Sequence, residues 1–389
     1  MTEQIIPLSV PSLKGNEFKY VKECIDTEWV SSAGSYVDKF AGEMARYAGT
    51  KYAVACSSGT AALHISLILT GVKEGDEVIV PDVTFIAPVN TVRYVGAHPV
   101  FMDCDDYLNI DAGKLARFCE DECDLITGGN LINKASGARI RAIIPVHIFG
   151  NPVNMDKIMD LAEKYGLKVI EDATESVGSY YKEGKYAGRK TGNVGDIGCY
   201  SFNGNKIITT GGGGMILTDD SEYARKADYL TNQAKNDSIR YVHNETGYNY
   251  RMNNIQAAIG CAQLERIEEF VDIKRRNFSL YKKALDGIEG LDLIGEPSYG
   301  FSNFWYYSLL VDKERYGLDW EELMKKLDEN GIQTRPLWQL NHRQIPYKDS
   351  QAYRIEKADY YYKRLLNIPC SVGLKAKDIE RVAEVMKDV

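Results

Sequence analysis

Several features that mark other classes of protein are missing from this chain of 389 residues. No uncharged apolar run approaches the ~20 residues that a membrane span requires. The opening segment MTEQIIPLSVPSLKG lacks the basic start and apolar core of a secretion signal. Acidic residues outnumber lysine and arginine, 55 to 47, which argues against nucleic acid or an anionic membrane as the main partner. We therefore expect a cytoplasmic protein.

The residues of metal sites and of nucleotide-binding loops are also scarce or scattered. Cys119 and Cys123 form the only close cysteine pair, and neither a second pair nor a histidine cluster completes a zinc site. We therefore expect no metal, and reduced, mostly buried thiols. Four glycines stand together at 211–214, but neither G-x-x-x-x-G-K-[ST] nor G-x-G-x-x-G is present. P-loop and dinucleotide-binding folds are thus disfavoured.

The chain does contain a regular alternation of short apolar runs and amphipathic stretches between about residues 50 and 220. The expected strands lie at 52–58, 76–81, 98–105, 141–150, 167–174, 197–202 and 213–220, and the expected helices at 60–71 and 155–166. Continuous apolar strands separated by helices predict an α/β fold with a mostly parallel central sheet covered on both faces. The length fits a large domain of this kind with a smaller one attached.

The second part of the chain has a different pattern of apolar and polar residues. Residues 250–286 have a helical pattern that includes the basic trio Lys274, Arg275 and Arg276, which we interpret as a solvated helix face. An aromatic β-like run at 303–312 and two helical segments follow, which predicts a small C-terminal α+β domain. We place the boundary so that residues 1–265 form the large domain and 266–389 the small one. The polar, glycine-containing segment 119–139 is predicted to be an insertion loop.

Polar residues follow several of the predicted strands. Ser57, Ser58, Gly59 and Thr60 stand between a strand and a helix, where free N–H groups and the helix dipole favour a phosphate, although ordinary helix caps have the same composition. Asp172 and Glu175, Ser201, and Lys206 follow later strands. Alone, Asp172 reads as a turn carboxylate and Lys206 as a surface lysine. In open parallel sheets, however, ligands bind at the carboxyl ends of the strands.

One cofactor requires this whole combination. Pyridoxal 5′-phosphate needs a lysine for a Schiff base, an acid beside its pyridine nitrogen and an anion site for its phosphate. An ionised aspartate beside the ring nitrogen keeps that nitrogen protonated. Phe85, which follows the predicted strand at 76–81, is placed to stack on the ring.

Seven blocks of the sequence resemble the DegT/StrS family of nucleotide-sugar aminotransferases. The blocks keep the family's order: SSGTAAL (57–63), PDVTFIAPVNTV (81–92), PVHIFGNP (145–152), IEDATES (170–176), YSFNGNKIITTGGGGM (200–215), GYNYRMNNIQAAIG (247–260) and TRPLW (334–338). The resemblance implies the aspartate-aminotransferase fold (fold type I), pyridoxal 5′-phosphate as cofactor, and a homodimer with shared active sites.

The resemblance also implies a role for individual residues. Lys206 matches the catalytic lysine that forms the Schiff base, Asp172 the partner of the pyridine nitrogen, and Phe85 the stacking aromatic residue. Ser58, Gly59, Thr60 and Ser201 match the phosphate site, and Asn249 the asparagine that reaches the phosphate from the neighbouring subunit. Glu175 occupies a position that usually carries glutamine or histidine beside the phenolic oxygen. Because a carboxylate there would repel a phenolate, we expect a raised Glu175 pKa.

The expected reaction moves an amino group from L-glutamate to C4 of a nucleotide-linked 4-keto-6-deoxy sugar. The blocks EDATES and YSFNGNK are similar to the LegC-like subgroup, which implies a UDP-linked 2-acetamido-2,6-dideoxy-4-keto-hexose on the way to bacillosamine-type or legionaminic-type products. A GDP- or dTDP-linked keto sugar, of perosamine or 3-amino type, is the alternative. Two other hypotheses are a sugar 3-dehydratase, whose relatives carry histidine in place of Lys206, and a non-catalytic cofactor-binding regulator.

Substrate-binding candidates are polar or aromatic residues outside the cofactor motifs. They are Trp29, Ser31, Ser32, Arg335 and His342. Arginine suits a diphosphate because its guanidinium donates two parallel hydrogen bonds. For each candidate, a purely structural role remains an equal alternative.

Overall fold

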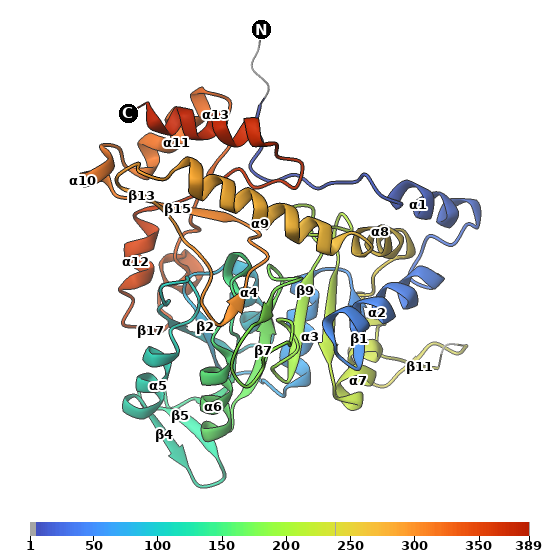
Figure 1. Ribbon diagram of the computed structural model, residues 1–389. Helices are drawn as coiled ribbons and strands as arrows, with labels where there is room; N and C mark the ends of the chain where they lie inside the picture. The colour runs from blue at the N-terminus through green and yellow to red at the C-terminus, as the bar shows by residue number, and fades with distance from the viewer. Residues whose placement is uncertain (1–4, 238, 389) are drawn as a thin grey trace.

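The computed structural model describes residues 5–237 and 239–388, and its centre is a mixed, mostly parallel β-sheet (Figure 1). The strand order is β1-β10-β9-β7-β6-β2-β3-β17. The bounds are β1 (Tyr52–Cys56), β2 (Glu77–Pro81), β3 (His98–Met102), β6 (Arg139–Ile143), β7 (Lys168–Asp172), β9 (Ile197–Ser201), β10 (Gly214–Thr218) and β17 (Ala352–Tyr353). Of these neighbours, only the pairs that include β10 are antiparallel. The predicted α/β sheet is thus confirmed.

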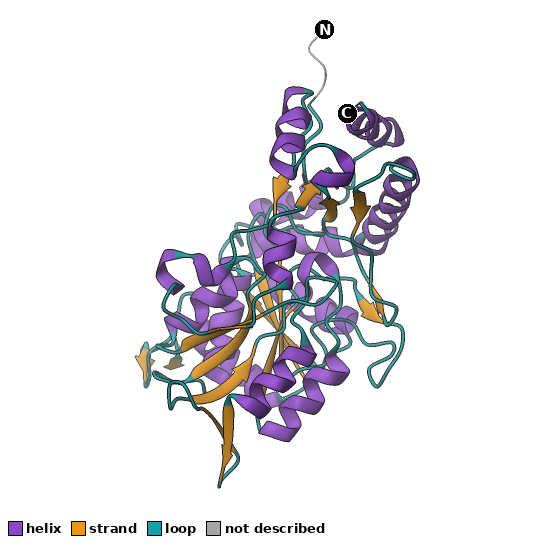
Figure 2. Cartoon of the chain, turned by 90° about the vertical axis from the view of Figure 1, so that its left-hand side faces the viewer, coloured by secondary structure: helices purple, strands orange, loops and turns teal. Residues whose placement is uncertain are grey.

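Helices cover both faces of this sheet (Figure 2). One face is packed by α3 (Gly59–Leu69), α4 (Ile86–Tyr94) and α7 (Ser221–Thr231), and the other by α2 (Ser35–Ala48), α5 (Ala112–Asp121), α6 (Met155–Tyr165) and α8 (Asn254–Leu264). Side chains of a strand alternate between the two cores: Ile216 of β10 packs on the α3 side, while Met215 and Leu217 pack on the α8 side. Burial on both faces explains the continuous apolar runs.

A second, smaller unit lies at one end of the main sheet, beyond α9 (Ile267–Ala284) (Figure 1). Its antiparallel sheet has the order β13-β15-β18-β16. The bounds are β13 (Leu291–Leu293), β15 (Tyr307–Val311), β16 (Arg335–Pro336), β18 (Leu365–Ile368), α10 (Lys313–Tyr316), α11 (Trp320–Glu329) and α13 (Ala376–Lys387). A separate apolar core joins α9, α11 and α13 to this sheet.

Segments from both ends of the chain cross between the two units. The predicted boundary between residues 265 and 266 lies in the turn between α8 and α9. Nevertheless, Ile6 packs in the core of the small unit and bridges to Ile332, while β17 adds a strand to the main sheet beside β3. The helix α12 (Lys357–Tyr362) also packs on the main core. Each unit therefore contains residues from both sides of the predicted boundary.

The remaining elements connect or edge these two units. They are α1 (Glu17–Asp26), β4 (Cys123–Ile126), β5 (Asn130–Asn133), β8 (Tyr180–Tyr181), β11 (Lys235–Asp237), β12 (Val242–His243), β14 (Gly300–Phe301), η1 (Ile148–Gly150), η2 (Asn341–Arg343) and η3 (Ile345–Tyr347). All eight cysteines are buried thiols, as expected. Among the described residues, no helix is both long and apolar enough to cross a membrane.

Two predictions from the sequence, the insertion loop at 119–139 and the solvated basic helix face, were wrong. Segment 119–139 is not an insertion loop: it holds the end of α5 and the β4–β5 hairpin, and β5 pairs with β6. The hairpin is held to the sheet because Cys123 and Leu131 enter the core, although Leu125 and Ile126 are exposed. The basic trio is not a uniformly solvated face either: Arg276 is exposed and Arg275 half-buried, but Lys274 is buried and its Nζ donates to the carbonyl oxygens of Trp305 (2.8 Å) and Cys370 (2.7 Å).

Candidate active site

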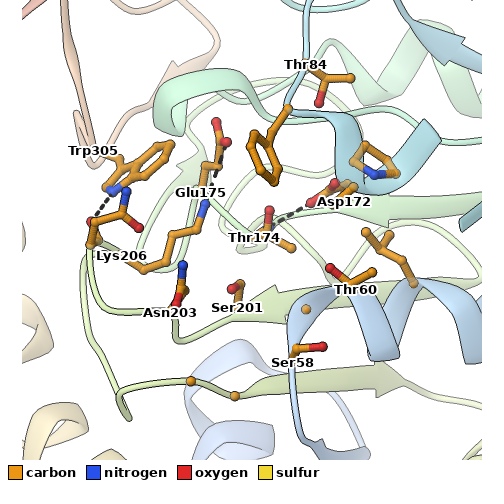
Figure 3. A pocket seen from close by; sticks show the side chains of 18 of the residues that line it. Ser58, Thr60, Thr84, Asp172, Thr174, Glu175, Ser201, Asn203, Lys206 and Trp305 are labelled. Carbon is orange, nitrogen blue, oxygen red and sulfur yellow. Dashed lines mark hydrogen bonds and ion pairs between the residues drawn. The ribbon is translucent and has the colours of Figure 1, made fainter. Parts of the chain in front are cut away.

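A cavity of about 340 Å³ opens at the carboxyl ends of the parallel strands. Chain direction places these ends together, and the start of the antiparallel strand β10 reaches the same edge. The labelled side chains of Figure 3 surround this space. The lining residues that matter below are Ser58, Gly59, Thr60, Thr84, Phe85, Asp172, Thr174, Glu175, Ser201, Asn203, Asn205, Lys206, Gly212, Gly213, Trp305, Tyr306 and Trp338.

The turn between β1 and α3 offers the cavity unpaired backbone donors. Ser58 is the N-cap of α3, and its hydroxyl accepts a hydrogen bond from the N–H of Ala61 (3.0 Å). The N–H groups of Gly59 and Thr60 have no hydrogen-bond partner within the described part of the chain. Free N–H groups and the positive end of a helix dipole make a binding site for an anion.

This turn lies so close to neighbouring segments that side chains are excluded. A Cβ added at Gly214, the first residue of β10, would lie 2.4 Å from the carbonyl carbon of Ser58 and 2.6 Å from the nitrogen of Gly59. A Cβ added at Gly59 would lie 2.8 Å from the Cβ of Ser201. The close approach holds the Ser201 side chain beside the free N–H groups, and it explains why glycine is required there.

Asp172 ends strand β7 and is buried in the cavity wall. Its Oδ1 accepts a hydrogen bond from the N–H of Thr174 (3.0 Å), as Figure 3 shows. Burial raises the pKa of Asp172, while the positive charge of Lys206 opposes that rise. A buried carboxyl of this kind is favoured in its ionised form by a cationic partner. The alternating strand geometry sends Glu171 to the opposite face, where Val194 N and Gly195 N donate to its carboxylate.

Lys206 lies in the loop after β9, with its amine between a carboxylate and an indole ring. Its Nζ is 3.7 Å from Oε1 of Glu175 and 3.9 Å from the ring centroid of Trp305. Burial lowers the Lys206 pKa, and the charges of Glu175 and Asp172 act in the opposite direction. A lysine with a lowered pKa supplies a neutral amine more readily, which suits it for carbonyl chemistry.

Glu175 is held by an unusual backbone conformation. Its Oε2 accepts from the N–H of Phe149 (2.8 Å), a residue in the left-handed region with φ of 53°. Burial raises the pKa of Glu175 to about 7, and the nearby Lys206 limits the rise. The raised pKa agrees with the expectation from the sequence, but burial in this chain causes it, whereas the sequence argument invoked repulsion by a cofactor oxygen.

Sequence reasoning missed one wall of the cavity. Trp305 and Tyr306 stack with centroids 4.1 Å apart and planes 13° apart, and Nε1 of Trp305 donates to the carbonyl oxygen of Asn205 (2.6 Å). Trp338 completes this wall and meets the half-exposed Phe85 edge to face at 6.1 Å. The aromatic run at 303–312 was the available signal, but its sequence did not indicate which rings face the cavity.

The remaining candidates lie outside the cavity lining. Asn249, Trp29 and Ser31 are exposed, and Ser32 is half-buried in the same N-terminal loop. Arg335 is exposed, yet its charge reaches the hydroxyl of Tyr306 in the cavity wall and lowers its pKa against the stronger effect of burial. His342 donates from its backbone N–H to Asp82 (2.8 Å), and its ring Nδ1 lies 2.6 Å from the same carboxylate. The cofactor role of Asn249 and the substrate roles of the others stay predictions.

The chemistry of the cavity residues fits pyridoxal 5′-phosphate. The free N–H groups of Gly59 and Thr60 fit a phosphate, and the glycines beneath them leave no side chain in its place. The buried Asp172 fits a cationic ring nitrogen, and Lys206 supplies an amine whose pKa burial has lowered. These groups meet in one cavity although they come from four separate stretches of sequence.

Comparison with solved structures defines the class. The chain superposes with a TM-score of 0.86 on a DegT DnrJ EryC1 StrS aminotransferase from Brucella abortus, at 25% identity over 96% of this chain and 94% of that one. It superposes equally well, with a TM-score of 0.86, on DesI crystallised in the presence of its TDP-sugar product, at 26% identity over 100% of this chain and 93% of that one. The fold is that of the fold type I, pyridoxal-phosphate-dependent aminotransferases.

Sequence comparison then gives the family. The model of the DegT/DnrJ/EryC1/StrS aminotransferase family matches residues 11–387. Similar curated proteins include the GDP-perosamine synthases of Caulobacter vibrioides, 39% identical over 99% of this chain and 98% of that protein, and of Escherichia coli O157:H7, 37% identical over 98% of both. The chain belongs to the DegT/DnrJ/EryC1/StrS aminotransferase family. It is a transaminase that acts on a nucleotide-linked sugar, and its cofactor is pyridoxal 5′-phosphate.

Proposed function

We propose that the protein transfers the amino group of L-glutamate to C4 of a GDP-linked 4-keto-6-deoxy sugar. The observation that carries the reaction is the meeting of Lys206, Asp172 and the free N–H groups of the β1–α3 turn in one cavity. When bound there, the cofactor accepts the amino group from the donor and stabilises negative charge at the reacting carbon.

Each cavity residue has a distinct task in this proposal. The N–H groups of Gly59 and Thr60, with the hydroxyl of Ser201, hold the phosphate, and Asp172 keeps the ring nitrogen protonated. Lys206 would supply the amine that holds the cofactor by its aldehyde group, and as a free amine it would move a proton to C4 of the sugar. Proton transfer by a positioned amine contributes about 10²–10⁴-fold to the rate. Phe85 stacks on the ring, and Glu175 faces the phenolic oxygen.

The relatives support a GDP-linked substrate over the UDP-linked one expected from the sequence. The UDP expectation rested on two short motifs. Three relatives that align over 98–99% of this chain, at 34–39% identity, are named GDP-perosamine synthases. A dTDP-linked sugar is a second candidate, because DesI was crystallised with a TDP-sugar product. Bacillosamine-type and legionaminic-type products are correspondingly less favoured.

We further propose a homodimer in which Asn249 of each chain completes the site of the other. Asn249 is exposed and lies outside its own chain's cavity lining, so it is free to reach another site. Exposed apolar side chains on α1 and the loop that follows, Phe18 (82% exposed), Ile25 (58%) and Trp29 (57%), support a covered surface in the assembly. Eight buried free thiols support the cytoplasm as the compartment.

The test is a substrate panel with the purified holoenzyme. L-glutamate is combined with GDP-, UDP- or dTDP-linked 4-keto-6-deoxy sugars, and formation of 2-oxoglutarate and the amino sugar is followed. We expect the GDP-linked sugar to give the highest kcat/KM. A higher value with a UDP-linked sugar would overturn the nucleotide assignment and leave the reaction class intact.

The same panel separates the other hypotheses. A 3-dehydratase would consume the keto sugar without forming an amino sugar, but Lys206 stands where those relatives carry histidine. A non-catalytic regulator would form no 2-oxoglutarate with any sugar in the panel. If the wild-type protein forms the amino sugar and 2-oxoglutarate and the Lys206→Ala variant does not, both the dehydratase and the regulator are excluded.

A further inference from the structure

The free amine of Lys206 has a defined resting position in this structure. It does not extend into open space: Glu175 lies on one side at 3.7 Å and the face of Trp305 on another at 3.9 Å, and Figure 3 shows this arrangement. Glu175 is buried and the side chain of Lys206 is only 12% exposed, so water weakens the interaction between them little. A cation over an aromatic face is favourable, and more so when water is excluded.

Both sides of this position are fixed by bonds to the backbone. Glu175 is anchored by Phe149 N through Oε2, which leaves Oε1 directed at the lysine. Trp305 is fixed by its Nε1 bond to the carbonyl of Asn205, the residue next to Lys206, and by the bond from its own N–H to Oδ1 of Asn303 (2.8 Å). Glu175 is unable to turn away without losing the bond from Phe149 N, and Trp305 is unable to do so without losing its Nε1 bond to Asn205. The position is therefore built into the fold.

We propose that Glu175 and Trp305 form a resting position for the Lys206 amine while that amine is not bonded to the cofactor, and that Glu175 exchanges a proton with it there. The exchange is balanced: the carboxyl loses its proton as the amine becomes an ammonium, and the reverse restores both neutral groups. Glu175 acts as proton partner and Trp305 as a positioning residue. The inference rests on the proposed role of Lys206 in the transamination.

The charges around the pair favour an easy exchange. Burial alone lowers the pKa of Lys206 and raises that of Glu175, which brings the two values toward each other. Asp172 also faces both groups and favours the ammonium, and the hydroxyl of Tyr306 lies within electrostatic reach of Glu175. Two groups of similar pKa pass a proton at little cost in free energy. A glutamine at position 175 would lack this ability.

The experiment measures the ionisation of Lys206 in the cofactor-free protein. Acetic anhydride labelling at a series of pH values, with mass spectrometry of the peptide that contains Lys206, gives its pKa. In Glu175→Gln, loss of the negative charge should lower that pKa and increase the labelling rate near pH 7 about tenfold or more. In Trp305→Leu, loss of the aromatic face should increase the rate about two- to thirtyfold. Trp305→Phe should stay near wild type because the face is retained.

Matched controls separate this effect from a general disturbance. Asp105 is another carboxyl whose pKa burial raises to about 7, and it lies outside the cavity lining, so Asp105→Asn should leave Lys206 labelling unchanged. Circular dichroism and the midpoint of urea unfolding establish that each variant is folded. Unchanged labelling in folded Glu175→Gln would overturn the proton exchange, and unchanged labelling in folded Trp305→Leu would overturn the role of Trp305.

A second readout uses the holoenzyme. The wild-type pH profile of kcat/KM should contain a limb from Glu175 near pH 7, and that limb should disappear in Glu175→Gln. Persistence of the limb in Glu175→Gln would contradict the proposal. The labelling measurement uses neither cofactor nor sugar, so an error in the proposed substrate would leave its result unaffected.

Discussion

Lys206 differs from the other lysines of the chain in the groups that surround its amine. Two carboxylates and an indole ring face it in a buried cavity, whereas Lys190, also with a pKa lowered by burial, lies over the ring of Tyr47 outside that cavity. Burial alone therefore does not define the reactive lysine. Lys190 also has a carboxylate nearby, with Oε1 of Glu268 3.5 Å from its Nζ, so the feature that distinguishes Lys206 is the cofactor-sized cavity in front of its amine.

The first prediction at this scale concerns the amine itself. Lys206→Ala should abolish the borohydride-stable attachment of the cofactor and reduce turnover by about 10²-fold or more, because Lys206 is the only lysine among the described residues that line the cavity. Visible absorbance after reduction and dialysis measures the attachment. Lys190→Ala is the matched control and should keep both properties. Near wild-type turnover in Lys206→Ala would disprove the proposed mechanism.

The sequence could indicate some of these residues and not others. Lys206 and Asp172 were predicted because the cofactor requires a lysine and an acid, and Glu175 because the family resemblance places its position beside the cofactor. Trp305 and Tyr306 were missed because their part in the cavity depends on the small unit docking against the main sheet, a contact about 100 residues away in the chain from Asn205. Long-range packing of this kind leaves no local pattern.

At the scale of elements, the anion site depends on three backbone segments that approach without side chains between them. Strand β1 supplies the turn, α3 the free N–H groups and β10 the glycine beneath them. The four glycines therefore act together with a turn about 150 residues earlier in the chain. Their sequence suggested closeness to a ligand, and the structure adds which backbone they approach.

Gly214→Ala tests this arrangement. The new Cβ would meet backbone atoms of Ser58 at 2.4 Å, and backbone does not yield as a flexible side chain does. We expect a loss of about 1–3 kcal/mol in the free energy of unfolding and weaker cofactor binding. Urea unfolding of the cofactor-free protein measures the first quantity and titration with pyridoxal 5′-phosphate the second.

Gly212→Ala is the control for that experiment. A Cβ at this position would have only the side chain of Gln256 nearby, at an ordinary 3.6 Å, so its unfolding free energy should stay within about 0.5 kcal/mol of wild type. Equal stability of the Gly214 and Gly212 variants would show that the close approach beneath the turn is unimportant.

Helices and strands could be predicted from the sequence where their side chains follow a plain pattern of burial. The strands of the main sheet are apolar on both faces and were predicted from that pattern, whereas the strands of the β4–β5 hairpin are short and half-exposed and are joined by a polar, glycine-containing turn. Lys274 was misread because a charged residue is ordinarily exposed. Here two carbonyl oxygens from distant segments replace water around its amine.

At the scale of the whole molecule, the proposed shared site leads to a test by mixing subunits. A Lys206→Ala chain and an Asn249→Ala chain should each be weakly active, for different reasons. After mixing under conditions that exchange subunits, each mixed dimer should contain one site that has both residues. Up to about a quarter of the wild-type number of sites should therefore be restored. The measurement is 2-oxoglutarate formation before and after exchange.

The control for this experiment is a mixture that is unable to complement. Lys206→Ala combined with a Lys206→Ala, Asn249→Ala double variant should stay inactive under the same conditions. Formation of mixed dimers, followed with differently tagged chains, must accompany the assay. Mixed dimers without recovered activity would contradict the sharing of sites through Asn249.

Because segments from both ends of the chain cross between the two units, the choice of junction in a chimera with a relative is restricted. Ile6 belongs to the core of the small unit and β17 to the sheet of the large one, so neither unit is a contiguous module. A chimera joined to a relative at residue 265 would carry mismatched partners in both cores, whatever the quality of the junction. A chimera that keeps both cores intact must exchange the N-terminal segment that contains Ile6 together with the C-terminal unit. It must also keep residues 337–362 with the sheet they cover.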